Sequence, residues 1–401
     1  MRLHPTAPSN IALFGVTALL LAGCAGGPDG NLPGDADIPA QDDREIASIP
    51  VGQPFGEAQW SVNVDASSEE QSPLVIGNHV VALSDGTVKA WSADGTEAWQ
   101  APTPSAGESS DVALRQADSN TVAVIATGVS EGEGLAESRY TAHVTLVDIT
   151  SGKTTEVDIA GSDVDAPSLS AVGVAFTLPD GTGVVITPEG ETVDVPDIAT
   201  TTGPPDNAEA DHPILALGDT VIWATTGGGE EQTGYATDTW STGDLDLLDY
   251  TQSSSIEALD LALGLVVVGA HASEHAFAVV DAATGDVVSD IECRPATFAS
   301  AVTSPNSKHS VVGPLQLTAH DAQCVGGGEG QQTVTLTAVT DDGTAYGRAS
   351  EGNLVVVPAG GGEPETSALP DGANPPIGFL EGNLAVHYDA GQGIVTANPV
   401  G

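Results

Sequence analysis

The hydrophobic positions between Phe55 and Gly401 fall in short runs of about four to seven residues, rich in Val, Ile, Leu and Ala. Gly, Asp-Gly, Thr-Gly or Asn separates successive runs, and no stretch keeps the 3.6-residue period of an amphipathic helix. Short β-branched runs bounded by turn residues are typical of β-strands. The pattern therefore predicts an all-β domain.

One segment shows the repeating unit most clearly. Residues 73–83 hold a strand, a turn at Gly77-Asn78 and a second strand. Residues 85–99 add a turn, a third strand, a turn at Asp94-Gly95 and a fourth strand that ends at Trp99. Four short strands in about thirty residues predict one antiparallel blade of a β-propeller.

The turn between the third and fourth strands recurs along the chain. Its marker glycines are 38 to 57 residues apart, at Gly95, Gly152, Gly190, Gly243 and Gly285. The turn between the first and second strands recurs in the same order, at Gly77-Asn78, Ser119-Asn120, Gly218-Asp219 and Gly382-Asn383. This spacing fits propeller blades that carry loop insertions.

The repeats predict eight blades, near residues 73–100, 111–160, 166–196, 213–250, 256–293, 297–328, 332–369 and 376–399. The sixth and seventh are the weakest assignments, and reading them as one inserted blade leaves seven as the alternative. A two-domain β-sandwich explains the strands but not the repeated order of turns.

The segment from Pro73 to Trp99 resembles the pyrroloquinoline-quinone-like β-propeller repeat of quinoproteins, with its Asp85-Gly86-Thr87-Val88 strand and its closing Asp94-Gly95 turn before Trp99. The resemblance implies four-stranded blades around a central channel. Residues 59–64 copy the fourth-strand pattern ahead of the first blade. We expect them to add the outer strand to the last blade, near residues 377–398, because such closure hides sheet edges.

The N-terminus carries an apolar run from Ile11 to Leu21 that follows Arg2 and ends in Leu21-Ala22-Gly23-Cys24. The run is too short for a transmembrane helix and suits the core of a signal peptide. Its ending resembles the bacterial lipobox, which implies diacylglyceryl transfer to the Cys24 sulfur and cleavage before Cys24. An ordinary secreted protein, in which this cysteine is incidental, is the alternative.

Three regions follow from these patterns. Residues 1–23 are expected to be the signal peptide and residues 55–401 the propeller. Residues 24–54 are rich in Pro, Gly and Asp, so we expect a flexible acidic tether with a reach of roughly 30 Å. The predicted location is the extracytoplasmic face of the cell membrane, with a lipid anchor.

Acidic residues far outnumber basic ones, with 56 Asp and Glu against nine Lys and Arg and a net charge of −47. This charge repels nucleic-acid phosphates and anionic head groups, so we expect no nucleic-acid partner and a membrane contact through lipid alone. Hydrophobic residues still make up 40% of the chain, which separates it from acidic disordered proteins. We expect a folded monomer.

The family resemblance raises the question of a cofactor. Quinone-dependent dehydrogenases hold the quinone between a Trp and a disulfide of adjacent cysteines, with Ca²⁺ on acidic and amide side chains, but no adjacent cysteines occur here. Trp60, Trp91 and Trp99 belong to the repeat pattern and are expected to pack blade against blade, whereas Trp223 and Trp240 have no assigned role. We expect no cofactor, with Ca²⁺ or pyrroloquinoline quinone as the alternative.

Other candidate sites lack the geometry that their chemistry needs. His271, Glu274 and His275 lie between strands rather than at helical spacing, so a solvated loop is preferred to a metal site. The acidic residues Asp163, Asp165, Asp244, Asp246 and Asp249 lack the pattern of a Ca²⁺ loop and are expected in surface turns. A Gly-x-Ser-x-Gly pattern occurs at residues 128–132, but no helical period follows it, so it does not predict the strand–turn–helix elbow of a hydrolase, and no consistent His and Asp partners accompany it. The sequence therefore indicates no catalytic residues.

Cys293 and Cys324 are the remaining cysteines and lie 31 positions apart. Export to an oxidising compartment favours a disulfide between neighbouring blades, with two free thiols as the alternative. Together the patterns predict a lipoprotein propeller that binds or scaffolds cell-envelope proteins, like the lipoprotein propellers that act as assembly scaffolds in bacterial envelopes. An oxidoreductase or other enzyme at the channel, and a sensor of small ligands or cations, are the alternatives.

Overall fold

A computed structural model describes residues 46–65, 71–105, 111–130, 138–159, 167–169, 173–178, 183–194, 209–217, 220–226, 233–236, 254–270, 276–293, 301–326 and 332–401. These residues form eight antiparallel sheets, seven with four strands and one with three described strands. The predicted all-β class and propeller architecture are confirmed. Each of the eight segments assigned to a blade from the sequence holds one sheet, and the sixth and seventh segments form two separate sheets.

We number the sheets as blades in chain order. Blade 1 contains β2 (Leu74–Ile76), β3 (His79–Ser84), β4 (Thr87–Ser92) and β5 (Glu97–Pro102). Blade 2 contains β6 (Asp111–Gln116), β7 (Thr121–Ser130), β8 (Arg139–Asp148) and β9 (Thr154–Ile159). Blade 3 contains β10 (Ser168–Leu169), β11 (Ala175–Thr177), β12 (Gly183–Ile186) and β13 (Thr192–Asp194). Blade 4 has the described strands β14 (Glu209–Leu217), β15 (Thr220–Thr226) and β16 (Thr233–Ala236).

The second half of the chain repeats this arrangement. Blade 5 contains β17 (Ser254–Asp260), β18 (Leu265–Ala270), β19 (Ala276–Asp281) and β20 (Val287–Glu292). Blade 6 contains β21 (Val302–Thr303), β22 (His309–Val312), β23 (Leu315–Thr318) and β24 (Asp321–Cys324). Blade 7 contains β25 (Val334–Val339), β26 (Ala345–Ala349), β27 (Leu354–Val357) and β28 (Glu365–Ser367). Blade 8 contains β29 (Gly378–Leu380), β30 (Leu384–Asp389), β31 (Ile394–Pro399) and the N-terminal β1 (Trp60–Asn63).

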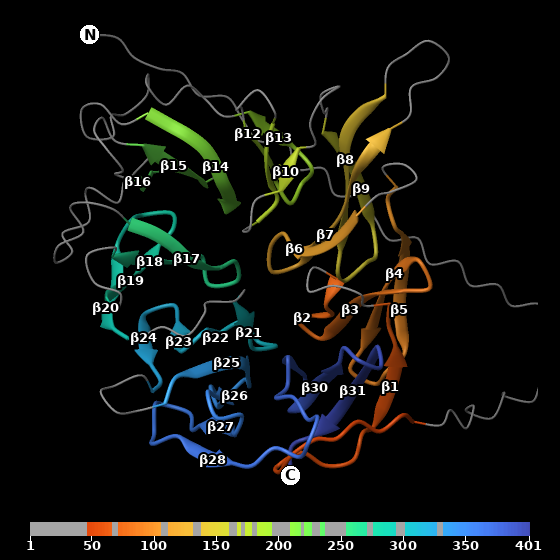
Figure 1. Ribbon diagram of the computed structural model, residues 1–401, viewed down its shortest axis with the longest axis vertical. Helices are drawn as coiled ribbons and strands as arrows, with labels where there is room; N and C mark the ends of the chain where they lie inside the picture. The colour runs from red at the N-terminus through yellow and green to blue at the C-terminus, as the bar shows by residue number, and fades with distance from the viewer. Residues whose placement is uncertain are drawn as a thin grey trace, which may run out of the picture. The chain divides into compact units, whose positions relative to one another are not determined.

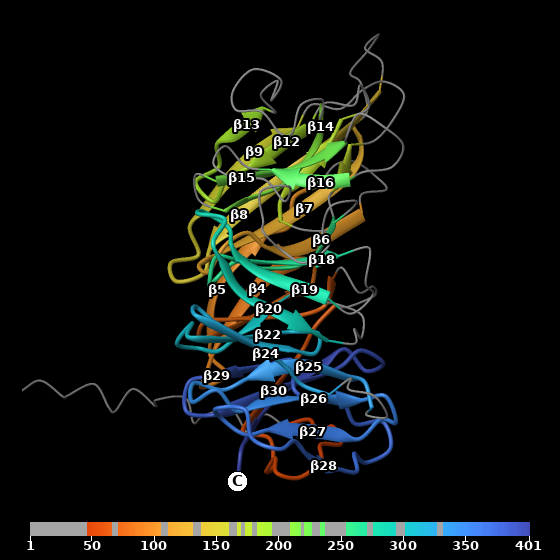
Figure 2. The same ribbon diagram turned by 90° about the vertical axis from the view of Figure 1, so that its left-hand side faces the viewer.

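Successive blades pack face against face around a ring (Figure 1). Blades 2 and 3 share one apolar core, β25 contacts both β22 and β29, and β29 of blade 8 contacts β2 of blade 1. Within blade 7 the strands follow in order from β25 to the outermost β28, as Figure 2 shows. Each junction between blades therefore has an inner part, near the first strands, and an outer part, near the fourth strands.

The N-terminal strand β1 is the outer strand of blade 8. It pairs antiparallel with β31, with Trp60 opposite Ala397 and Asn63 opposite Ile394. This is the pairing that the sequence predicted for residues 59–64. Ahead of β1, Phe55 forms an isolated antiparallel bridge with Val400.

The contact of the chain with the propeller begins earlier than the sequence suggested. The tether was expected to extend to residue 54, but Ile49 is buried, the backbone N–H of Ala47 donates to Ser61 Oγ, and that of Gly401 donates to Pro54 O. The compact unit of the domain begins at Ile46. Apolar side chains explain the difference, because Val51 packs against the core of blades 7 and 8 and Ile49 is buried.

Tryptophans fill the outer part of two junctions. The Trp99 ring of blade 1 covers Gly152 in the β8–β9 turn of blade 2, so a Cβ at Gly152 would lie 2.7 Å from Trp99 Cβ. Trp60 covers Gly95 in the same way, and its Nε1 donates to Ala93 O at 2.8 Å. Gly152 has φ 67°, so glycine serves both the turn and the close approach of the ring. The predicted packing of Trp60 and Trp99 between blades is confirmed, and Trp91 is buried in the core that joins blades 8 and 1.

Candidate binding pocket between blades 6 and 7

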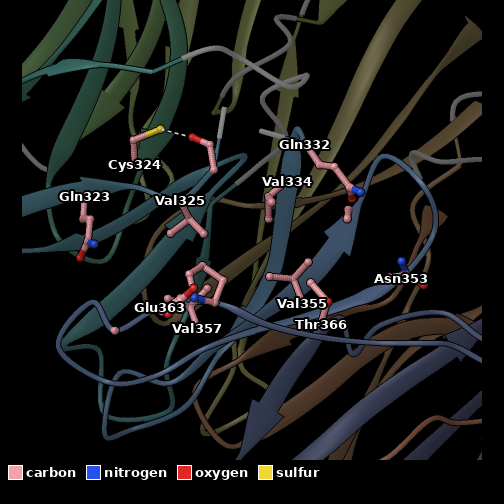
Figure 3. Close-up of a pocket in the computed structure, with 14 residues that line it drawn as sticks. Gln323, Cys324, Val325, Gln332, Val334, Asn353, Val355, Val357, Glu363 and Thr366 are labelled. Atoms are coloured by element: carbon pink, nitrogen blue, oxygen red, sulfur yellow. Dashed lines mark hydrogen bonds between the residues drawn. The ribbon is translucent and has the colours of Figure 1, made fainter. Parts of the chain in front are cut away.

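A pocket of about 460 Å³ opens between the outer strand of blade 6 and the facing side of blade 7 (Figure 3). Its volume lies within the range of sites for small molecules or short peptide segments. We call it the 6/7 pocket. It is lined by Gln323, Cys324, Val325, Gly326, Gln332, Val334, Ala349, Asn353, Val355, Val357, Gly362, Glu363, Pro364 and Thr366.

At the 6/7 pocket a glutamine occupies the place that Trp60 and Trp99 take at two other junctions and that Thr155 takes over Gly190 between blades 2 and 3. Gln323 lies on β24, the outer strand of blade 6, and covers Gly361 in the turn before the outer strand of blade 7. A Cβ atom at Gly361 would overlap the Gln323 amide. Gly361 has φ 80° and its N–H donates to Pro358 O, three residues earlier, as the N–H of Gly95 does to Ser92 O. The same docking contact is present, but the smaller side chain leaves part of the outer junction unfilled.

The floor of the pocket is aliphatic. Val325 comes from blade 6, and Val334, Val355 and Val357 come from blade 7. All four are buried and belong to the apolar core that joins the two blades. Residues at every second position of a strand share one face of the sheet, so Val355 and Val357 present adjacent side chains to the pocket. An apolar group that enters the pocket would contact an existing core.

The rim is polar and carries a single charge. Gln323, Gln332 and Asn353 supply amides, Thr366 supplies a hydroxyl and Glu363 supplies a carboxylate. Figure 3 shows Gln323 and Asn353 at opposite ends of the pocket with the valines between them. None of the 14 lining residues is basic. An apolar floor with a polar rim is the usual composition of a protein-binding surface.

A disulfide holds one wall of the pocket. Cys293, which directly follows β20 of blade 5, is bonded to Cys324 on β24, with 5.7 Å between their Cα atoms. The structure thus joins the two cysteines that the sequence analysis pairs. The bond ties the outer strand of blade 6 back to blade 5, so it restrains β24 from moving toward blade 7 and narrowing the pocket.

Hydrogen bonds hold blades 6 and 7 together away from the pocket. The backbone N–H of Asn306 donates to Asp341 Oδ1 at 2.8 Å, and Asn306 Nδ2 donates to Asp341 O at 3.1 Å. The buried Gln316 side chain donates through Nε2 to Gly343 O. Because these contacts secure the junction, the outer pocket can remain open without separating the blades.

A second polar region lies between blades 7 and 8. His387 on β30 is buried, its Nδ1 lies 3.1 Å from Asn374 O, and its ring meets the Phe55 ring edge-on at 4.6 Å between centroids. Burial lowers the pKa of His387 to about 4, against the opposing effect of the hydrogen bond to Asn374. Arg348 donates to Ala373 O at 2.7 Å from the same side. The imidazole is therefore neutral at neutral pH and has a packing role.

A buried carboxyl lies between blades 5 and 6. Asp260 Oδ1 accepts hydrogen bonds from the backbone N–H groups of Ala262 and Leu263, at 3.0 and 2.9 Å. Burial raises the pKa of this carboxyl above its usual value. Its bonds close the β17–β18 turn, so its position is explained by the fold.

Most of the residues that the sequence singled out lie outside the part of the chain that the structure describes. These are Cys24, Asp163, Asp165, Trp240, Asp244, Asp246, Asp249, His271, Glu274 and His275. Trp223 lies on β15, but its side chain is also outside the description. Within the described ranges, no group of three or more His, Cys, Asp or Glu could hold a metal ion, and no helix could cross a membrane.

The 6/7 pocket was not predicted from the sequence. Its signal was present in the repeat, because the fourth strand of blade 6 reads Asp321-Ala322-Gln323-Cys324 where blade 1 has Trp99. The triple glycine 360–362 of blade 7 marked the turn on which a large side chain could dock. A comparison of the docking position blade by blade would have placed Gln323 here beside Trp60 and Trp99 at two junctions and Thr155 at a third.

No family model matches the chain, and no curated protein matches its sequence. Among solved structures, the chain is similar to the β-propeller domain of Cps50 (Swd1) from Myceliophteria thermophila, with 12% identity, 87% of this chain and 100% of that chain covered, and a TM-score of 0.41. A chain of the Mitotic Checkpoint Complex shows 13% identity, coverage of 88% of this chain and 98% of that chain, and a TM-score of 0.37. The assignment of the propeller therefore rests on the sheets and contacts described above.

Proposed function

We propose that this chain is an extracytoplasmic lipoprotein whose propeller binds protein partners through the 6/7 pocket. The observation that carries the proposal is the open outer junction at Gln323 and Gly361, in contrast to the two junctions that Trp60 and Trp99 fill. A pocket with a valine floor and an amide rim suits recognition of a peptide segment.

The membrane anchor is supported by the sequence of the N-terminus. The apolar run and the Leu21-Ala22-Gly23-Cys24 ending support lipidation of Cys24, and the net charge of −47 leaves lipid as the means of attachment. The pattern from Pro73 to Trp99, together with the docking of Trp99 on Gly152, supports a place among propellers with pyrroloquinoline-quinone-like repeats. A protein so anchored would present the pocket to other envelope proteins.

The test compares partner capture from native membranes by the lipidated wild-type chain and by Gln323→Trp, which should fill the pocket by docking an indole on Gly361. We expect a partner that is captured by the wild type and lost with the variant. Trp99→Phe, which keeps a large ring at another junction, is the matched control and should capture normally. A set of captured proteins that is identical for all three chains would contradict the proposal.

The anchor is tested separately with Cys24→Ser. We expect the variant to leave the membrane fraction or to accumulate unprocessed, because no thiol is present to accept the lipid. A processed Cys24→Ser chain that stays in the membrane fraction would show that the lipid anchor is wrong.

A further inference from the structure

We propose that the 6/7 pocket binds an extended segment of a cationic protein, with a branched aliphatic side chain on the valine floor and a Lys or Arg beside Glu363. The proposal rests on the proposed function and adds the chemistry of the partner. It follows from three properties of the pocket: the shape of its floor, the hydrogen-bonding groups of its rim and the sign of its charge.

The floor selects an aliphatic group. Val325, Val334, Val355 and Val357 are each less than a tenth exposed, and no aromatic side chain lines the pocket. A branched aliphatic side chain that enters between these valines leaves water and joins the core of blades 6 and 7. The indole that fills the corresponding space at Trp99 shows that a large apolar group at this position is compatible with the fold.

The rim selects a peptide backbone. Gln323, Gln332 and Asn353 each carry one carbonyl acceptor and an NH₂ donor, which are the groups that a peptide unit needs as partners. Gln323 and Asn353 lie at opposite ends of the pocket (Figure 3). An extended segment that crosses the valines could therefore form hydrogen bonds at both ends of its path.

The charge selects a cationic partner. Glu363 is the single charged group among the lining residues, and it is exposed. Glu351 and Glu365 lie within two positions of the lining residues Asn353 and Thr366 and are also exposed. The whole chain carries 56 acidic and nine basic residues. Its field accelerates encounter with cationic partners and repels acidic ones, so a Lys or Arg next to the aliphatic side chain completes the match.

The probe for the experiment is a library of random peptides displayed on phage and selected on the mature chain, with counter-selection on Gln323→Trp. We expect the enriched peptides to pair an aliphatic residue with Lys or Arg within one extended segment. Their affinity should fall with added salt, because the charges at the rim are exposed. Enriched peptides that are acidic, lack aliphatic residues or bind Gln323→Trp equally well would overturn the proposal.

A second variant keeps the test decisive if Gln323→Trp does not fold. Thr366 lies on the exposed strand β28, so Thr366→Lys should leave the fold intact while placing a positive charge at the pocket. The matched control is Thr154→Lys, at an exposed position on the outer strand of blade 2. We expect Thr366→Lys to weaken the selected peptides and Thr154→Lys to leave them unchanged, and equal binding to both variants would contradict the assigned site.

Glu363→Gln measures how much the charge of Glu363 contributes to the affinity for the peptide. Because Glu363 is exposed, its pairing with a peptide Lys or Arg should contribute modestly, and we expect roughly two- to fivefold weaker binding. No change in affinity or in its salt dependence would contradict the role of Glu363. Partner capture that is lost with Gln323→Trp while the library yields acidic peptides would refute the cationic segment and leave the proposed function standing. Capture that is unaffected by Gln323→Trp would refute the function itself.

Discussion

The junction of blades 1 and 2 and the junction of blades 6 and 7 have the same design with different occupants. In both, a side chain on the outer strand of one blade covers a glycine in the last turn of the next. At the first junction this side chain is the buried Trp99, within a core that contains many side chains from both blades. At the second it is Gln323, and blade 6 contributes only Val311 and Val325 as buried apolar side chains to the described core.

The outer part of a propeller junction can serve two purposes. Filling the outer junction stabilises the ring, whereas leaving it open provides a binding surface. Blades 6 and 7 are held at their inner side by Asn306, Gln316 and Asp341, and the disulfide at Cys324 restrains the outer strand. Among the described junctions, the protein therefore keeps an open pocket at this one and closes two with Trp60 and Trp99.

The largest effect is expected from removing β1, because this deletes Trp60 and leaves β31 with an unpaired edge. A chain that begins at Ile46 should unfold like the mature protein, since compact packing begins there. A chain that begins at Asp65 should aggregate or lose several kcal/mol, including roughly 3–5 kcal/mol for the buried ring. Equilibrium denaturation of both chains checks this, and equal stability would mean that β1 is dispensable.

Opening the junction of blades 1 and 2 should be the next most damaging change. Trp99→Gln gives this junction the side chain found at blades 6 and 7, and we expect a loss of about 3 kcal/mol, because much of the indole packing disappears. Urea denaturation gives the difference, with Trp99→Phe as the milder control. If Trp99→Gln were as stable as the wild type, tryptophan docking would not be the feature that distinguishes the two junctions.

The junction of blades 7 and 8 should weaken in acid because of His387. Its pKa is lowered to about 4 by burial, so below about pH 6.5 the unfolded chain takes up a proton that the folded chain does not. The stabilisation is complete above the unfolded pKa and is lost as the pH falls toward the folded pKa. Between about pH 7.5 and pH 5 we expect a loss of about 2 kcal/mol from this group.

The contribution of His387 is measured as the difference between the wild type and His387→Gln in urea denaturation at the two pH values. The comparison removes the effect of the many carboxylates that both chains share. The wild type should lose more stability in acid than the variant. An identical pH dependence of the two chains would show that His387 takes up its proton equally in the folded and unfolded states.

The smallest stability change is expected at the open junction. Gln323→Trp should dock on Gly361 as Trp99 docks on Gly152 and should raise stability by about 1 kcal/mol, the usual gain from filling a cavity. Thermal or urea unfolding measures the change. A strongly destabilised Gln323→Trp chain would mean that the two junctions differ in backbone geometry as well as in the occupant.

The blades could be predicted from the sequence because their signals are local. Strand runs, turn glycines such as Gly95 and Gly152, and tryptophans near them all occur within one repeat. The pairing of β1 with β31 was also accessible, since residues 59–64 copy a fourth strand that has no blade of its own.

The pocket and the buried polar groups could not be predicted in the same way, because they depend on contacts between blades. Gln323 matters only because it meets Gly361, 38 positions later, and His387 is buried partly by Phe55 from the far end of the chain. The predicted end of the tether at residue 54 was wrong for a related reason. Ile49 and Val51 lie in a short stretch with no strand pattern, and Val51 packs on a core that residues from blades 7 and 8 form.

The role of Gln323 is tested most directly by measuring both the stability and the partner binding of Trp99→Gln and Gln323→Trp side by side. We predict that Trp99→Gln loses stability and, at a temperature where it is folded, binds the captured partner normally. Gln323→Trp should keep or gain stability and lose binding. The reverse pattern, or a loss of binding by both variants in proportion to their stability, would contradict the claim that the glutamine keeps this junction open for a partner.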